Sequence, residues 1–166
     1  MFGRSRLAGQ QSPGSQVQAA VTQVVRWAGR ADVRGKLLGT AGRELSVNDV
    51  NLLRVIVAYG PVRVSDLAEW QGVDKSTITP QVRRLEERGF VARHPDPADR
   101  RAVLLSATAH GRRIRQKMDA AGAAVFDDVL RDWPKDDRLA LATLLSRFAQ
   151  QLSDQPPSRI RRPVGR

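Results

Sequence analysis

The sequence predicts a mainly helical fold that contains one small β-hairpin. Apolar residues recur at helical spacing through most of the 166-residue chain. Several of these stretches begin at Ser, Thr or Asp and end at Gly, which are common helix boundaries. The exception is residues 90–106, where "FVAR" and "RAVLLS" predict two strands joined by the polar turn "HPDPAD". A chain of this length can form one domain with a sizeable core.

Two longer helices are expected in the first part of the chain. The first runs from about residue 16 to Arg30, on the helical spacing of its valines. The glycine-rich stretch that follows, "GRADVRGKLLGTAGREL", predicts either a loop or a broken helix. The second helix begins at Ser46, which forms a pattern like a capping box with Asp49, and it ends at "YGP".

A short third helix, which Ser65 is expected to cap, and a longer fourth helix come next. The fourth is "DKSTITPQVRRLEERGF", with Asp74 as its cap and Gly89 closing it in the left-handed conformation. Pro80 allows two interpretations of this helix: a continuous, bent helix, or a helix that Thr79 caps with Pro80 at its first position. The continuous helix is favoured, because the apolar residues on both sides of Pro80 then share one face.

The two helices expected after the hairpin complete the domain. Thr108 caps a long helix that "WP" interrupts, and a last helix runs to Leu152. The first and the last helix carry apolar stripes that are long for packing on one chain, so they predict a homodimer interface; the alternative is that they belong to the core. Residues 1–15 and 153–166 combine few apolar residues with several arginines, which predicts disordered basic tails around a domain of residues 16–152.

The composition limits the classes of function. The formal net charge is +11, which favours a polyanionic partner, nucleic acid first and an anionic membrane second. The absence of cysteine excludes disulfides, thiol redox sensing and zinc sites built on cysteine. No apolar run approaches the roughly 18 residues of a membrane span, and the first residues do not resemble a signal peptide. A cytoplasmic location without membrane contact is expected.

The order of the middle elements is typical of a winged helix-turn-helix. In this arrangement the second helix of the pair enters the major groove of DNA, and the hairpin lies along the backbone or minor groove. The fourth helix fits, with Ile78, Val82 and Leu85 on one side and donors or cations on the other. The candidate DNA-contacting residues of this helix are Lys75, Ser76, Thr77, Thr79, Pro80, Gln81, Arg83 and Arg84. The alternative is a solvated face whose arginines pair with Glu86 and Glu87.

Two further features bear on DNA contact. Arg100 and Arg101 stand at the end of the hairpin turn, where a wing touches DNA; the alternative is a surface charge pair with Asp96 or Asp99. Pro80 offers no donor, so we expect it to contact a thymine methyl group and to leave hydrogen bonding to its neighbours.

The middle of the chain resembles the DNA-binding core of MarR-type transcriptional regulators. The similarity covers residues 62–111, and its most specific marks are "STIT", "RRLEERGFV", "DPADRR" and a capping Thr108 followed by Gly111. Weaker similarity in helix order extends over residues 16–152. The sequence departs from the family at Gln71, where relatives often have leucine, and at Pro80, where they often have a long polar or basic residue.

The resemblance implies a ligand-responsive repressor. Helices within 16–31 and 107–152 would form a two-fold dimer around the winged core, residues 46–106, and the dimer would bind a pseudo-palindrome in double-stranded DNA. Ser76, Thr77, Gln81 and Arg84 would contact DNA. Arg101 would enter the minor groove, with Asp99 orienting it. A small aromatic or phenolic effector would bind between the dimer helices and the winged core, and Trp27 is a candidate pocket residue.

No arrangement of residues predicts an enzyme, a cofactor or a metal site. The sequence has no phosphate-binding glycine loop, and its two histidines have no neighbour at typical metal-ligand spacing. His94 beside Asp96 is more simply a polar turn, and the aspartates near Trp133 are more simply a solvated helix end. The second class of function left open is a non-enzymatic winged-helix module that binds protein or RNA.

Overall fold

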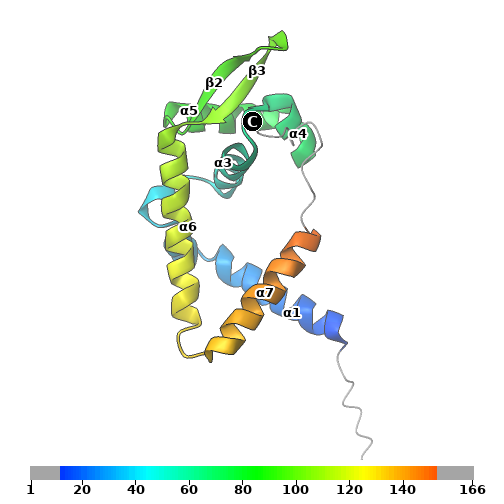
Figure 1. Ribbon diagram of the computed structural model, residues 1–166, viewed down its shortest axis with the longest axis vertical. Coiled ribbons are helices and arrows are strands. Elements are labelled where there is room, and N and C mark those ends of the chain that lie inside the picture. Colours follow the sequence, from blue (N-terminus) through cyan, green and yellow to red (C-terminus); the bar gives the residue numbers. More distant parts are fainter. Residues whose placement is uncertain (1–11, 153–166) are drawn as a thin grey trace, which may run out of the picture.

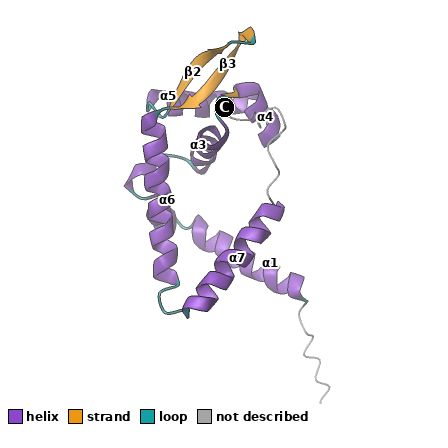
Figure 2. Cartoon of the chain, in the orientation of Figure 1, coloured by secondary structure: helices purple, strands orange, loops and turns teal. Residues whose placement is uncertain are grey.

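The computed structural model describes residues 12–152, without the side chains of Ala41, Arg100 and Arg101. Helices make up most of this part, and the strands lie together at one end (Figure 2). The helices are α1 (Pro13–Gly29), α2 (Ala31–Leu38), α3 (Val47–Tyr59), α4 (Val64–Gln71), α5 (Lys75–Glu87), α6 (Ala109–Val129) and α7 (Lys135–Leu152). A short 3-10 helix (Thr40–Gly42) follows α2, and the strands are β1 (Val62–Arg63), β2 (Val91–Asp96) and β3 (Asp99–Ala107). The predicted fold class is confirmed.

The hydrophobic core lies between α3, α4, α5 and the sheet. Its fully buried leucines and isoleucines are Leu52, Leu53, Ile56, Leu67, Ile78, Leu85 and Leu105. In Figure 1 this core is at one end of the molecule, α6 leads away from it, and α1 and α7 lie at the other end. Neither α1 nor α7 contains a buried residue. A single chain therefore leaves the apolar side chains of these two helices uncovered.

The sheet is antiparallel, in the order β1-β3-β2. The sequence does not predict β1, because a strand of two residues carries no alternating pattern. The hairpin turn is also shorter than predicted, since β2 continues to Asp96 and β3 begins at Asp99. The Asp96 carboxylate accepts a hydrogen bond from the backbone N–H of Ala98 at 2.8 Å, which closes the turn early. Pro95 is tolerated in β2 because β2 is an edge strand.

The start of the domain differs from the prediction. α1 begins at Pro13, inside the segment 1–15 that the sequence predicts as a tail. Ser12 caps it, and the Ser12 hydroxyl accepts a hydrogen bond from the N–H of Ser15 at 3.2 Å. The glycine-rich stretch is a broken helix, in which the extended residue Arg30 separates α1 from α2. The rest of the two predicted tails lies outside the described residues.

The other helix boundaries test the capping predictions. The predicted capping box is confirmed, since Ser46 and Asp49 each accept a hydrogen bond from the backbone N–H of the other. Gly89 is left-handed, with φ of 69°. The Ser65 cap is wrong: α4 begins at Val64 and no side chain caps it. Within residues 12–152, no helix combines the length and the apolar character that crossing a membrane requires.

Thr108 joins the start of α6 to the end of α5 and to β2. Its backbone N–H donates to the Phe90 carbonyl at 3.0 Å, and its hydroxyl donates to the Gly89 carbonyl at 2.6 Å. The same hydroxyl accepts a hydrogen bond from the N–H of Gly111 at 3.0 Å, which caps α6 as predicted. The first turn of α6 is therefore bonded directly to the chain that leaves α5.

Gly111→Ala is expected to destabilise the fold by about 3 kcal/mol, because a β-carbon at this position meets the backbone. An added Cβ would lie 2.1 Å from the Phe90 carbonyl oxygen. Gly35→Ala in α2 is the control, since a Cβ there meets nothing within 4 Å. Urea unfolding at one protein concentration would measure both variants. Equal midpoints would contradict the close packing at Gly111.

Candidate nucleic-acid interface

α5 lies beside the base of the hairpin (Figure 1), and one of its faces carries exposed polar residues. The opposite face is buried through Ile78, Val82 and Leu85, as predicted. The exposed candidates are Lys75, Ser76, Thr77, Thr79, Pro80 and Arg83. This face offers hydroxyl groups and cations without large apolar side chains, which suits contact with phosphates and base edges.

α5 is continuous through Pro80, so the helix does not begin at Pro80 with Thr79 as its cap; the bend stays a prediction. Asp74 occupies the cap position, but its side chain makes no capping hydrogen bond. Because Pro80 has no N–H, the Ser76 carbonyl loses its usual helical donor. The Thr79 hydroxyl donates to the neighbouring Lys75 carbonyl at 2.6 Å, which adds a bond to the same turn. This bond goes to the carbonyl one residue before the one that Pro80 deprives of its helical donor.

Gln81 does not lie on the exposed face where the sequence analysis placed it. Its side chain is only 8% exposed, and its Nε2 donates to the Thr77 carbonyl at 3.2 Å. Position 81 stands three residues after Ile78 and four before Leu85, so it belongs to the buried stripe of the helix. Its Oε1 atom has no hydrogen-bond partner among the described residues.

Arg84 is held by a carboxylate that the sequence analysis did not assign to it. Arg84 Nη2 lies 2.8 Å from Asp49 Oδ1, and its Nε lies 3.3 Å from Oδ2. The Asp49 carboxylate is buried, and it also accepts the N–H of Ser46 at 3.1 Å. One carboxylate thus closes the first turn of α3 and holds α5.

The Asp49 carboxylate is expected to make the free energy of unfolding decrease at acidic pH. Burial raises the pKa of Asp49, but hydrogen bonds from Arg84 and Ser46 outweigh it, so the pKa lies below its ordinary value of 3.8. The stability that the charged form contributes is complete above 3.8 and is lost as the pH falls through the lower, folded-state pKa. Unfolding free energies measured from about pH 5 downwards should therefore fall more steeply in the wild type than in Asp49→Asn. Parallel curves would contradict the pair.

One of the two α5 glutamates pairs as the solvated-face alternative expects, and the other does not. Glu87 does pair with Arg83, at 2.8 Å on the surface. Glu86 instead accepts a hydrogen bond from Arg93 of β2 at 2.6 Å. Arg84 pairs with Asp49 of α3 and not with either glutamate. Since the surface pair contributes little, Arg83 can exchange Glu87 for a phosphate at small cost.

The turn end of the wing is fixed by an ion pair that sequence analysis missed. Arg63 donates to one Asp96 oxygen through Nε at 2.8 Å and Nη2 at 2.5 Å. The Asp96 side chain is 1% exposed, and Arg63 also lies 3.9 Å from Asp99. Arg100 and Arg101 are the second and third residues of β3. Their contact with DNA, and the orienting role of Asp99, stay predictions.

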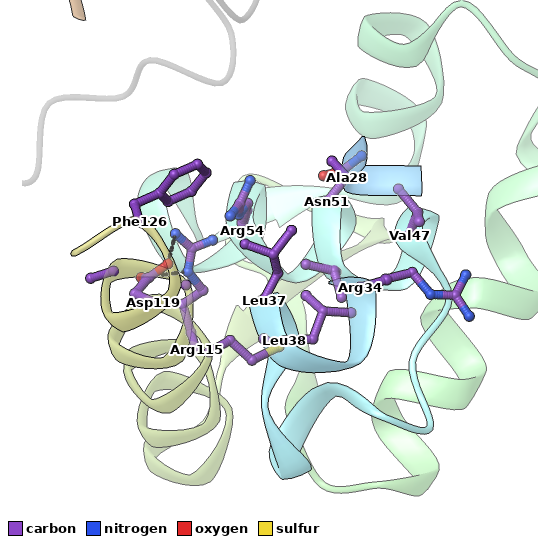
Figure 3. Close-up of a pocket in the computed structure, with 14 residues that line it drawn as sticks. Ala28, Arg34, Leu37, Leu38, Val47, Asn51, Arg54, Arg115, Asp119 and Phe126 are labelled. Atoms are coloured by element: carbon purple, nitrogen blue, oxygen red, sulfur yellow. Dashed lines mark hydrogen bonds and ion pairs between the residues drawn. The ribbon is translucent and has the colours of Figure 1, made fainter. Parts of the chain in front are cut away.

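A cavity of about 440 Å³ lies between α2, α3 and α6. Figure 3 shows Leu37, Leu38 and Phe126 around it, with Arg54 near the Arg115–Asp119 pair. The lining residues are Ala28, Arg34, Leu37, Leu38, Val47, Val50, Asn51, Arg54, Arg115, Met118, Asp119, Gly122, Ala123 and Phe126. Trp27, the predicted pocket residue, is not among them, but its ring packs on Phe126 with centroids 5.9 Å apart. Trp27 therefore contacts a residue of the cavity wall without lining the cavity itself.

The cavity carries more positive than negative charge. Arg115 is paired with Asp119 at 2.5 Å. Burial, followed by the nearby positive charge of Arg115, lowers the pKa of Arg54. The walls thus combine apolar surface with a partly buried guanidinium, which suits a small molecule that has both an apolar body and a polar group.

The helix pair α4–α5 with an adjoining hairpin defines a winged helix-turn-helix protein. Residues 45–103 match the model of the MarR family. The chain is 27% identical over 144 residues to YxaD, an HTH-type transcriptional regulator of Bacillus subtilis (strain 168), with 87% of this chain and 98% of that protein covered. A crystal structure of MarR is 27% identical, with a TM-score of 0.61 and coverage of 86% and 92%.

A third comparison shares the fold at lower identity. The crystal structure of FabT from Streptococcus pneumoniae in complex with DNA is 20% identical, with a TM-score of 0.64 and coverage of 85% of this chain and 98% of that one. Residues 45–103 are thus similar to the MarR family, and most of the chain is similar to an HTH-type transcriptional regulator and to MarR itself.

Proposed function

We propose that the protein is a sequence-specific regulator that binds a pseudo-palindromic operator in double-stranded DNA and represses transcription there. The observation that carries this proposal is the exposed polar face of α5, held beside the hairpin by the Glu86–Arg93 pair. FabT, which has the same fold, was crystallised with DNA. Because the family consists of transcriptional regulators, we assign the protein a non-enzymatic role in the cytoplasm.

Dimerisation is supported by the uncovered apolar helices. The large exposed apolar side chains of α1 and α7 are Val17, Val21, Val24, Val25, Leu139, Leu144, Leu145 and Leu152. Phe126, Val129 and Trp133, at the end of α6 and after it, are also exposed. Burying such a surface against a second copy is favourable, and two-fold symmetry is the commonest arrangement. A two-fold dimer would then present two α5 helices to two half-sites.

Regulation by a small aromatic or phenolic effector is supported by the cavity. Its walls include α3, which belongs to the winged core, and α6, which leads to the uncovered helices. A molecule bound there would touch both parts. A ring would pack on Phe126 and on the leucines of α2.

Selection of bound fragments from genomic DNA would test the proposed function. We expect recovered sites with two inverted half-sites whose centres are about 10–10.5 base pairs apart. A duplex with the scrambled sequence should bind more weakly at the same salt concentration. Equal binding to both duplexes, or a preference for RNA, would favour the alternative interaction module.

Pro80→Ala is expected to keep the fold and to relax base preference at one thymine-bearing step in each half-site. Alanine restores the backbone donor for Ser76, so the helix should not lose stability. The exposed proline ring, however, is an apolar surface that suits a thymine methyl group. Binding-site selection on the variant would measure this. An unchanged base preference at every position would show that Pro80 does not contribute to base recognition.

A further inference from the structure

The pair Asp49–Arg84 joins two helices that are far apart in the sequence, across 35 residues. The Asp49 side chain is 2% exposed, so DNA on the outer face of α5 cannot reach it. The Arg84 side chain is 42% exposed. Two of its guanidinium nitrogens, Nε and Nη2, nevertheless donate hydrogen bonds to the Asp49 carboxylate. Moving Arg84 to a base edge would leave a buried carboxylate without its cation, which is strongly unfavourable.

The remaining contacts between α5 and α3 are less directional. Ile78, Val82 and Leu85 bury the inner face of α5, and apolar burial fixes which face is inside without fixing the tilt of the helix strongly. A bidentate arginine–carboxylate pair has a defined geometry. The pair Glu86–Arg93 connects α5 to β2 through one hydrogen bond, from Arg93 Nε to Glu86 Oε1. Helix and hairpin are therefore tied together, and Arg84 ties both to α3.

We propose that Arg84 is a positioning residue, which pairs with Asp49 to set the orientation of α5 on α3, and that operator affinity depends on this buried carboxylate although DNA never contacts it. The proposal rests on the proposed function and changes the role expected for Arg84 from reading DNA to holding the reading helix. The exposed residues of α5 and the wing would then supply the direct contacts.

Asp49→Asn and Arg84→Lys separate positioning from contact. Asn at position 49 can still accept the N–H of Ser46, so it keeps the cap and removes the charge. Lys at position 84 keeps the charge that a phosphate would need and removes the bidentate geometry. The matched control is the exposed bidentate pair Arg30–Asp32, with both distances 3.1 Å, changed in the same two ways.

We expect Asp49→Asn and Arg84→Lys each to weaken operator binding about tenfold, and the double variant to be no weaker than the more affected single variant. The Arg30 and Asp32 controls should bind like the wild type. The slope of log affinity against log salt should stay unchanged in every variant, because the number of neutralised phosphates is the same. Base preference should also stay unchanged.

Two results would overturn the proposal. One is wild-type affinity in Asp49→Asn. The other is a salt slope in Arg84→Gln reduced by about 0.9 per subunit, which would place Arg84 on a phosphate. If Asp49→Asn does not fold, Arg84→Lys decides alone, because it leaves the capping box intact.

If the wild type binds no duplex, the proposed function fails instead. Amide hydrogen exchange of α5 in the free protein then tests the Asp49–Arg84 pair. Faster exchange in Arg84→Lys than in Arg30→Lys supports the pair, and equal exchange refutes it.

Discussion

Leu144→Glu is expected to separate the dimer into monomers and to weaken operator binding by about 10²–10⁴-fold. Leu144 lies in the apolar stripe of α7 and is 55% exposed in the single chain. A dimer interface through this stripe would bury the new carboxylates without partners. Each monomer would then bind one half-site and would lose the effective concentration that links the second half-site to the first.

Gln150→Glu provides the same change of charge at an exposed polar position of α7. It should leave both the dimer and its affinity for the operator unchanged. Analytical ultracentrifugation at micromolar concentration would give the mass, and titration of a palindromic duplex would give the affinity. A Leu144→Glu protein that remains dimeric would show that α7 lies outside the interface, and monomers that bind with full affinity would show that the second half-site contributes nothing.

Asp96→Ala is expected to destabilise the protein by about 2 kcal/mol and to weaken operator binding by about 10–100-fold. The Asp96 carboxylate closes the wing turn through Ala98 and holds Arg63 at the start of α4. Without it, the turn loses the bond that keeps it short. The DNA contacts proposed for Arg100 and Arg101, which follow this turn in β3, would then be weakened.

Asp99→Ala is the comparison for the wing, because Asp99 lies only three positions away and is 46% exposed. Its pair with Arg63 is longer, at 3.9 Å, so the loss of stability should be well below that of Asp96→Ala. Urea unfolding and duplex titration would measure both variants. Equal stability losses would show that burial of Asp96 is not what fixes the wing.

The parts of the fold that could be predicted are those formed by residues close to one another in the sequence. The capping box at Ser46, the left-handed Gly89 and the Thr108 cap each involve residues at most a few positions apart, and all three are present. The continuous helix through Pro80 followed from keeping Ile78 in phase with the rest of the buried stripe. The same periodicity places Gln81 inside, so its burial was available from the sequence.

The ion pairs could not be predicted in the same way. Asp49 and Arg84 are 35 residues apart, and Arg63 and Asp96 are 33 apart. Each arginine has several carboxylates nearer in sequence, and the choice among them is made only when the helices pack. Sequence analysis therefore assigned Arg84 to DNA. It assigned Asp96, at most, to Arg100 or Arg101.

The hydrogen bonds of Thr108 mean that a tilt of α6 is transmitted to α5 and β2. With 21 residues, α6 is roughly 31 Å long at about 1.5 Å per residue. A tilt of about 10° around its far end would carry Thr108 roughly 5 Å sideways, and Thr108 is bonded to the backbone that joins α5 to β2. This displacement exceeds the spacing of about 3.4 Å between successive base pairs. In a two-fold dimer, a small change of angle between the two copies would therefore shift one α5 helix relative to the other. The shift would be larger than the distance between successive base pairs.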